Sequence, residues 1–138
     1  MTLDDFVGLW TMTRQIEDRR AGRQGTLSGQ ARFTPDKGGL LYSETGTLRF
    51  PGQPDLSARQ SYLWQADGDA INVLFHDGRP FHRFVPKDVQ CAATHDCPPD
   101  TYNVRYNFAQ RPGWSVTWFV TGPRKNYEMH TGYVRIRV

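Results

Sequence analysis

Apolar and polar residues alternate along most of this chain, in short runs that turn-forming residues separate. In residues 102–108 and again in residues 114–121, aromatic and aliphatic side chains occupy every second position. A period of two is typical of a β-strand with one buried face. The pattern predicts ten strands, which cover residues 10–17, 26–33, 40–50, 57–65, 71–76, 79–85, 89–94, 102–108, 114–121 and 127–138.

The connections between these runs are short. Asp77-Gly78 is a two-residue hairpin signal, and residues 35–39 are rich in proline and glycine. No helical period lies between the runs, which excludes parallel βαβ units. The pattern therefore predicts an all-β domain over residues 1–138, an antiparallel up-and-down barrel of about ten strands, with a sandwich as the alternative. A closed barrel has no free edge and has room for one small ligand.

The first residues predict a short helix, because Thr2 and Asp5 have the spacing of a capping box. A Gly-x-Trp motif ending at Trp10 follows, and this opening resembles that of lipocalin-like barrels. The resemblance implies that the helix plugs the closed end of the barrel. It also implies that Trp10 packs against an arginine of the last strand, Arg135 or Arg137.

Composition and charge narrow the class of partner. Arginine supplies 14 of the 17 basic residues, but these are spread along the chain and the net charge is only +3. This distribution does not indicate a nucleic-acid surface. No apolar run reaches the ~18 residues that cross a membrane, and the acidic N-terminus lacks the regions of a signal peptide. We therefore expect a cytoplasmic protein that binds neither nucleic acid nor membrane, and a homodimer is left open.

Five segments together resemble a known family. They are RQIED (14–18), LYSETGTL (41–48), DGRPFH (77–82), HDCPPDTYNVRYNF (95–108) and WSVTWFVTGPRKNY (114–127). The combination is similar to an uncharacterised family of small, mostly microbial domains of unknown function, regarded as lipocalin-like β-barrels. The resemblance covers nearly the whole chain. It implies a fold but no reaction, and it supplies no catalytic residue.

Polar side chains interrupt the apolar faces of several strands. Tyr42 shares a face with Glu44, and Tyr102 shares one with Tyr106. Such faces fit a lumen that orients a polar or amphipathic ligand, although tyrosine also spans the boundary with water in any β protein. The candidate lumen residues are Tyr42, Glu44, Tyr102, Tyr106 and Arg135, and the candidates near the mouth are Arg79, His82, His95 and Arg124. We expect a small-molecule ligand that is anionic or amphipathic.

Arginines within strands have two interpretations. Several at the lumen would attract a carboxylate or phosphate. Those that are buried, among Arg14, Arg59 and Arg135, could instead form structural ion pairs with Glu44, Glu17 or Asp18. Both interpretations stay open at this point.

An enzyme is the main alternative. His82 or His95 would act as acid or base on a small anionic or carbonyl substrate, and would need a pocket position within reach of Glu44, Asp100 or a tyrosine. No nucleophile elbow, phosphate loop or paired-carboxylate motif is present, so enzymatic activity is left open. An interaction module with an exposed apolar face is a further alternative.

A metal or haem is a weaker hypothesis. His76, His82, His95 and Cys97 are ligating types, but their spacing matches no known zinc motif. One of these histidines or His130 could serve as a proximal haem ligand. The cofactor is therefore unknown. Cys91 and Cys97 lack redox spacing, so we expect reduced thiols, and their pairing is left open.

Overall fold

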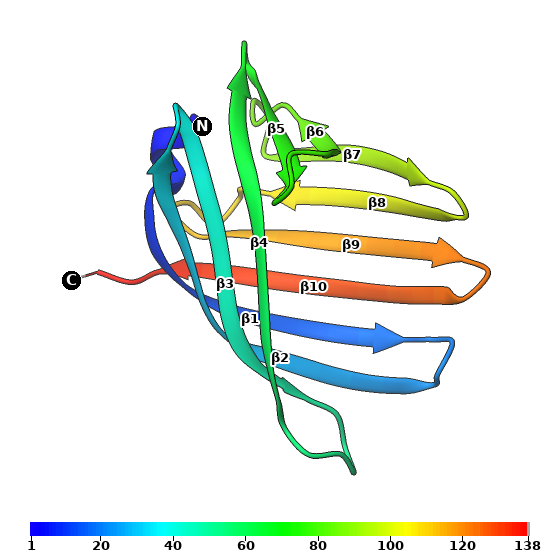
Figure 1. Ribbon diagram of the computed structural model, residues 1–138. Helices are drawn as coiled ribbons and strands as arrows, with labels where there is room; N and C mark the ends of the chain where they lie inside the picture. Colours follow the sequence, from blue (N-terminus) through cyan, green and yellow to red (C-terminus); the bar gives the residue numbers. More distant parts are fainter. Residues whose placement is uncertain (138) are drawn as a thin grey trace.

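The computed structural model describes residues 1–137, apart from the side chain of Asp96. Within this range ten strands form one antiparallel sheet in the order β6-β5-β4-β3-β2-β1-β10-β9-β8-β7 (Figure 1). The strands are β1 (Gly8–Asp18), β2 (Arg23–Asp36), β3 (Gly39–Arg49), β4 (Leu56–Asp67), β5 (Ala70–Phe75), β6 (Pro80–Phe84), β7 (Gln90–Cys97), β8 (Asp100–Asn107), β9 (Trp114–Gly122) and β10 (Lys125–Arg135).

The predicted fold is confirmed. All ten expected strands are present, and all sequence neighbours except β6 and β7 pair with each other, in the up-and-down order that we expected. The expected N-terminal helix is a single 3-10 turn, η1 (Leu3–Phe6), in which Asp5 accepts a hydrogen bond from the backbone N–H of Thr2 at 2.7 Å. Val138, the predicted end of the last strand, lies outside the described residues.

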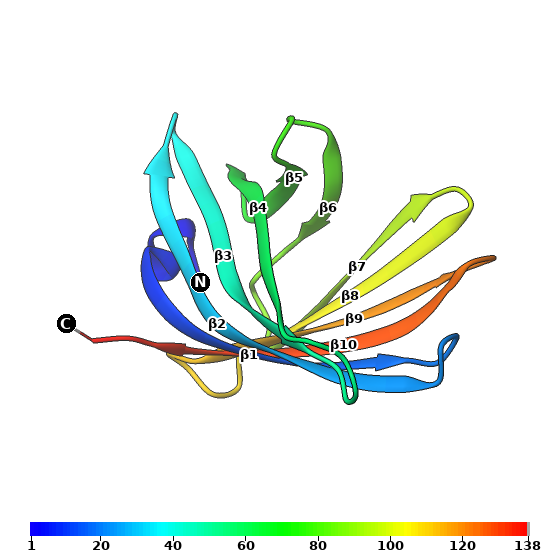
Figure 2. The ribbon, with the colours of Figure 1, turned by 60° about the horizontal axis from the view of Figure 1, so that its bottom comes forward.

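Pairing of β1 with β10 joins the first strand of the chain to the last, so that all ten strands form one continuous sheet. The ladder runs from Trp10 opposite Arg135 to Asp18 opposite Tyr127. The view along the barrel in Figure 2 shows the curled sheet, with η1 at one end.

The barrel is not closed by hydrogen bonds all the way round, which differs from our expectation. Among the described residues β6 and β7 share no ladder, and we call this gap the seam. β6 is short and begins at Pro80, which has no N–H to donate. Side chains fill the seam: the rings of Phe81 and His95 are 5.4 Å apart, and those of Phe84 and Tyr106 stack at 3.9 Å.

The closed end follows the Gly-x-Trp expectation. Trp10 is fully buried, and its indole N–H donates to the carbonyl of Phe6 at 2.9 Å. The guanidinium of Arg135 lies 4.2 Å from the centre of the Trp10 ring and donates to the carbonyls of Val7 and Asp5. Gly8 is required here, since its φ is +129° and an added Cβ would lie 2.8 Å from Arg135. Of the two predicted partners, Arg135 is the one that packs on Trp10.

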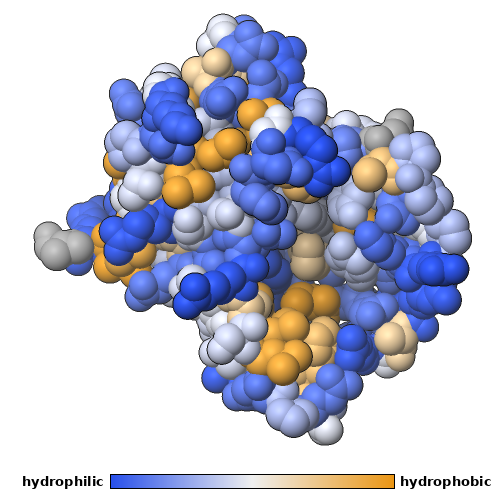
Figure 3. Space-filling view, in the orientation of Figure 1, coloured by the Kyte–Doolittle hydropathy of each residue, from blue (hydrophilic) through white to orange (hydrophobic). Residues whose placement is uncertain are grey.

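The outer surface seen in Figure 3 is mostly hydrophilic, with apolar residues in separate small groups. The hydrophobic side chains face inward instead, and the largest fully buried ones are aromatic, among them Phe6, Phe33 and Phe108. In residues 1–137 no helix has the length and hydrophobicity to cross a membrane.

We predict that Arg135→Ala lowers the free energy of unfolding by about 2–3 kcal/mol, because it removes a cation–π contact and hydrogen bonds to two carbonyls. Urea denaturation measures the loss. Arg137→Ala is the control, since Arg137 is exposed, and it should change stability by less than about 0.5 kcal/mol. Equal losses in the two variants would contradict the role of Arg135 at the closed end.

Candidate functional site

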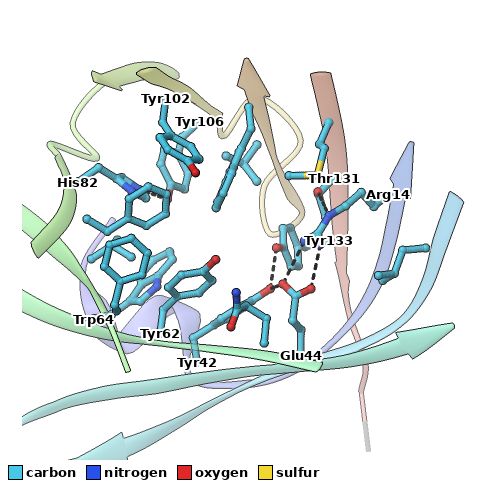
Figure 4. Close-up of a pocket in the computed structure, with 18 of the residues that line it drawn as sticks. Arg14, Tyr42, Glu44, Tyr62, Trp64, His82, Tyr102, Tyr106, Thr131 and Tyr133 are labelled. Atoms are coloured by element: carbon cyan, nitrogen blue, oxygen red, sulfur yellow. Dashed lines mark hydrogen bonds and ion pairs between the residues drawn. The ribbon is translucent and has the colours of Figure 1, made fainter. Parts of the chain in front are cut away.

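A cavity of about 350 Å³ occupies the interior of the barrel (Figure 4). Its wall is aromatic to an unusual degree, because all six tyrosines of the chain and three of the four tryptophans line it. These residues are Tyr42, Tyr62, Tyr102, Tyr106, Tyr127, Tyr133, Trp64, Trp114 and Trp118. Aromatic rings on many strands therefore give the cavity flat apolar surfaces.

An ion pair lies in one wall of this cavity. The guanidinium of Arg14 (β1) holds the carboxylate of Glu44 (β3) at 2.9 and 3.0 Å, and its Nε donates to Thr131 at 2.8 Å. Glu44 is only 5% exposed. β2 runs between the two strands and carries Gly29 and Ala31 on the same face, so no large side chain separates the partners. The structural ion pair that the sequence left open is confirmed.

Two tyrosines extend the pair into a chain of fixed direction. The hydroxyl of Tyr42 donates to Glu44 at 2.7 Å, because a carboxylate can only accept. The single proton of Tyr42 is then used, so the hydroxyl of Tyr133, 2.8 Å away, must donate to Tyr42. Burial raises the pKa of Tyr42 well above its ordinary value and that of Tyr133 to about 12. Both phenols therefore stay protonated at neutral pH.

Arg14 also stays charged. Desolvation by burial acts to lower its pKa, but Tyr133 and Glu44 raise it by more, so the net pKa is above its ordinary value. The positive charge of Arg14 is matched by the carboxylate of Glu44. The network as a whole adds no net charge to the cavity.

A second polar pair lies on the opposite wall, at the seam. His82 is 7% exposed, and its Nε2 is 2.8 Å from the hydroxyl of Tyr106. Burial, with a smaller contribution from the charge of His95, lowers the pKa of His82 to about 3. The imidazole is therefore neutral at neutral pH. His82 Nδ1 and the indole nitrogen of Trp114 are buried without a hydrogen-bond partner among the described residues.

The hydroxyls of Tyr62 and Tyr102 point toward the middle of the cavity (Figure 4). Burial raises the pKa of Tyr62, while a hydrogen bond with the Gln60 side chain acts in the opposite direction. Tyr102 accepts a hydrogen bond from the ammonium of Lys125 at 3.3 Å. Lys125 also pairs with Asp100 at 3.0 Å, and these hydrogen bonds raise the pKa of Lys125.

Five of the nine candidate residues line the cavity together. They are Tyr42, Glu44, His82, Tyr102 and Tyr106. The face assignments made from strand alternation therefore match the structure for β3 and β8. His82 was placed near the mouth, but it lies inside the wall because β6 turns this position toward the cavity.

The other four candidates are not among the lining residues. Arg79 is exposed at the β5–β6 turn and pairs with Asp77 at 2.7 Å, and Arg124 is exposed in the β9–β10 turn. His95 is half-buried opposite Tyr102 in the β7–β8 ladder and packs against Phe81, outside the cavity lining. The lumen assignment of Arg135 is wrong, because stacking on Trp10 holds this residue at the closed end.

Several lining residues were missed. Tyr62 and Trp64 alternate along β4, and Thr131 and Tyr133 continue the face of Tyr127 along β10. Their alternation was visible in the sequence. It could not say which of the two faces of each strand turns inward.

The metal and haem hypotheses gain no site. Among residues 1–137, leaving aside the side chain of Asp96, no three His, Cys, Asp or Glu side chains gather as metal ligands. His76 and Cys97 are exposed at the tips of two different hairpins, and Cys91 and Cys97 are free thiols. His82 is the one histidine in the cavity wall, and Tyr106 occupies its Nε2 while its Nδ1 is enclosed. These residues do not fit an axial haem ligand.

We predict strong coupling between Arg14 and Glu44. Arg14→Met and Glu44→Gln each leave one buried charge unpaired and should cost about 3 kcal/mol or more in unfolding free energy. The double variant should lose less than the sum by about 2 kcal/mol or more. Urea denaturation of the four proteins measures this difference. Asp55→Asn, which breaks the exposed Arg49–Asp55 pair, is the control and should cost below about 1 kcal/mol. Additive losses would contradict the coupling.

We also predict an acid-sensitive contribution from His82. The unfolded chain binds a proton at His82 near pH 6.5, whereas the folded protein binds it only near pH 3, so stability falls as the pH falls through this window. From pH 7 to about pH 5 the loss should be about 2 kcal/mol. His82→Phe should remove this part of the slope in urea denaturation, and His76→Asn should keep it. An imidazole signal of His82 that titrates near pH 6.5 by NMR would refute the prediction.

Comparison with known proteins supports the fold. No curated protein matches the sequence significantly. A protein of unknown function from the DUF3598 family of Nostoc punctiforme PCC 73102 superposes with a TM-score of 0.68 at 10% identity, over 99% of this chain and 49% of that one. The S-type phycobiliprotein lyase CPES from Guillardia theta superposes with a TM-score of 0.67 at 10% identity, over 99% of this chain and 91% of that one. The chain thus spans about half of the first protein and nearly all of the second, and at this identity the likeness shows the fold alone.

The sequence identifies the family of the chain more directly than the structural comparisons do. The model of a family of unknown function, DUF6314, matches residues 6–135. This range holds every strand and every lining residue described above, and it agrees with the expected kinship to an uncharacterised barrel family. The chain belongs to the DUF6314 family of unknown function.

Proposed function

We propose that this barrel binds a small, flat and largely apolar molecule in its lumen. The observation that carries the proposal is the interior cavity whose wall contains all six tyrosines and three tryptophans. Aromatic walls with a few directed polar groups are typical of small-molecule sites. Flat rings favour a flat ligand, which they contact face to face or edge to face.

The cavity volume limits the ligand. About 350 Å³ equals the space of about twelve water molecules at ~30 Å³ each. This suits a molecule of two or three fused rings. The fold likeness to a phycobiliprotein lyase supports small-molecule handling in general, but it carries no specific ligand to this chain.

Charge favours a neutral, amphipathic ligand over the anionic one. Glu44 already neutralises Arg14, and His82 is uncharged. The remaining charged lining residue, Arg59, is exposed. A carboxylate moved into this lumen would lose its hydration without gaining an unpaired cation, which is costly.

The enzyme alternative has one supporting observation and one against it. His82 lines the cavity and lies within hydrogen-bond reach of a tyrosine, as that hypothesis required. However, a pKa of about 3 makes His82 a weak base that holds no proton at neutral pH. We therefore assign no reaction to this site.

The interaction-module alternative has little support. It would need a filled interior and a large exposed apolar patch. Instead the interior holds a cavity, and the exposed large hydrophobic residues among those described are Leu56, Val89 and Val134, which lie on or beside different strands.

The proposal predicts that the neutral fluorescent probe N-phenyl-1-naphthylamine binds with a micromolar dissociation constant and gains emission. Ala58→Trp should weaken binding at least tenfold, because Ala58 lines the cavity and the indole would fill it. Ala66→Trp is the matched control on β4, since Ala66 is exposed and outside the lining. Absence of probe binding to the wild type, or equal effects of the two substitutions, would refute lumen binding.

A further inference from the structure

We infer that Tyr62 and Tyr102 hold the ligand by donating hydrogen bonds to an uncharged acceptor oxygen, such as a ketone or other carbonyl. This inference rests on the proposed function and specifies the polar chemistry of the same site. It follows from where the protons of the cavity point and from which acceptors are already used.

Tyr62 offers its proton to the cavity. The residue is 9% exposed, its ring stacks on Phe81 at 5.7 Å, and Trp118 lies 6.3 Å away. These contacts fix the ring, and the hydroxyl points into the cavity (Figure 4). A phenol oxygen can accept a hydrogen bond from the Gln60 amide and still donate its own proton, so Tyr62 can offer that proton to a ligand.

Tyr102, on β8, also offers its proton to the cavity. Its ring packs edge-on against Phe81 at 5.6 Å and lies 6.4 Å from Trp118. An ammonium has no acceptor, so in the 3.3 Å contact Lys125 must donate and the Tyr102 oxygen must accept. The proton of Tyr102 is then free to point into the cavity. Tyr62 and Tyr102 therefore both direct a hydrogen-bond donor into the same cavity. Their rings are held there by contacts with the same two residues, Phe81 and Trp118.

The acceptors of the wall are already occupied. The carboxylate of Glu44 accepts hydrogen bonds from Arg14 and Tyr42, and the hydroxyl of Tyr42 accepts one from Tyr133. The strongest acceptor of the lumen is therefore satisfied within the protein. A ligand group that donates a hydrogen bond would have to compete with Arg14 for Glu44.

The seam adds to the surplus of donors. If Tyr106 donates to His82 Nε2, the proton of the imidazole lies on Nδ1, which has no partner among the described residues. If His82 donates instead, the buried Tyr106 proton has no acceptor. One donor is left over in either tautomer, and the indole N–H of Trp114 is another. These donors are enclosed in the wall, so they show that the wall is short of acceptors and do not themselves contact the ligand.

The acceptor is uncharged for a reason specific to Tyr102. Lys125 is the nearest cation to this hydroxyl, and Asp100 pairs with it at 3.0 Å. The charge of Lys125, like that of Arg14, is therefore neutralised by a neighbouring carboxylate. A carbonyl oxygen gains both phenol hydrogen bonds without the desolvation cost of an anion.

Three molecules with one flat skeleton test the inference: 9-fluorenone carries a carbonyl, carbazole an N–H donor and fluorene a methylene at the same position. Their dissociation constants are measured by displacement of N-phenyl-1-naphthylamine. Fluorenone should bind about tenfold more tightly than fluorene, and carbazole should gain nothing over fluorene. One hydrogen bond corresponds to about three- to tenfold in affinity.

Tyr62→Phe and Tyr102→Phe keep the rings and remove the hydroxyls. Each should reduce the fluorenone preference about threefold, and the double variant should abolish it while fluorene affinity is unchanged. Thr11→Val is the control, since it removes an exposed hydroxyl outside the cavity lining, and it should keep the preference. Urea denaturation first verifies that each variant is folded.

The outcomes separate the two proposals. Equal binding of the three molecules, a preference for carbazole, or a fluorenone preference that survives the double substitution would overturn the donor assignment while leaving lumen binding intact. Failure of the naphthylamine probe and all three molecules to bind would overturn the proposed function itself.

Discussion

The ladder between β1 and β10 is the constraint on which the rest of this molecule depends. It joins the first and last strands of the chain in the middle of the sheet, and its register sets Trp10 opposite Arg135 and Arg14 opposite Thr131. The first pair builds the closed end, and the second begins the ion-pair network of the cavity. Because side chains alternate between faces, a slip of one residue would turn Arg14 out of the barrel and leave Glu44 unpaired. The packing of the closed end and the ion-pair network of the cavity therefore depend on the same strand register.

The two walls of the cavity have different tasks. On one side Arg14, Glu44, Tyr42 and Tyr133 satisfy one another, which ties β1, β3 and β10 together across the interior. On the other side the hydroxyls of Tyr62 and Tyr102 keep their protons available for a ligand. A buried ion pair adds little net stability compared with apolar packing, and its clearest value is to fix one arrangement. Here it holds one wall rigid, while the binding capacity that we propose lies on the opposite wall.

Much of the fold was predictable because it is encoded locally. Alternation located all ten strands, and Gly-x-Trp pointed to Arg135 or Arg137 at the closed end. The same local reasoning also placed Arg135 in the lumen, because alternation gives a face but not a height along the barrel.

The seam was not predictable, since it arises from the short β6 and from its distance to β7, and neither is visible in a single strand. For the same reason the sequence could not tell that His82 would line the cavity while His95 would not. Tyr42, Glu44, Tyr102 and Tyr106 were assigned to the correct face because each stands in a regular strand. The donor direction of each hydroxyl, in contrast, needed the partners in space.

The placement of the tyrosines has an optical consequence. Every tyrosine and all tryptophans except Trp10 touch the cavity, so nearly all the near-ultraviolet chromophores of the protein share one small chiral enclosure. Trp114 and Tyr133 even stack at 3.9 Å, close enough for their transitions to couple. The near-ultraviolet circular dichroism of this protein is therefore a spectrum of its lumen, and a transparent molecule that enters the barrel would be seen without any label.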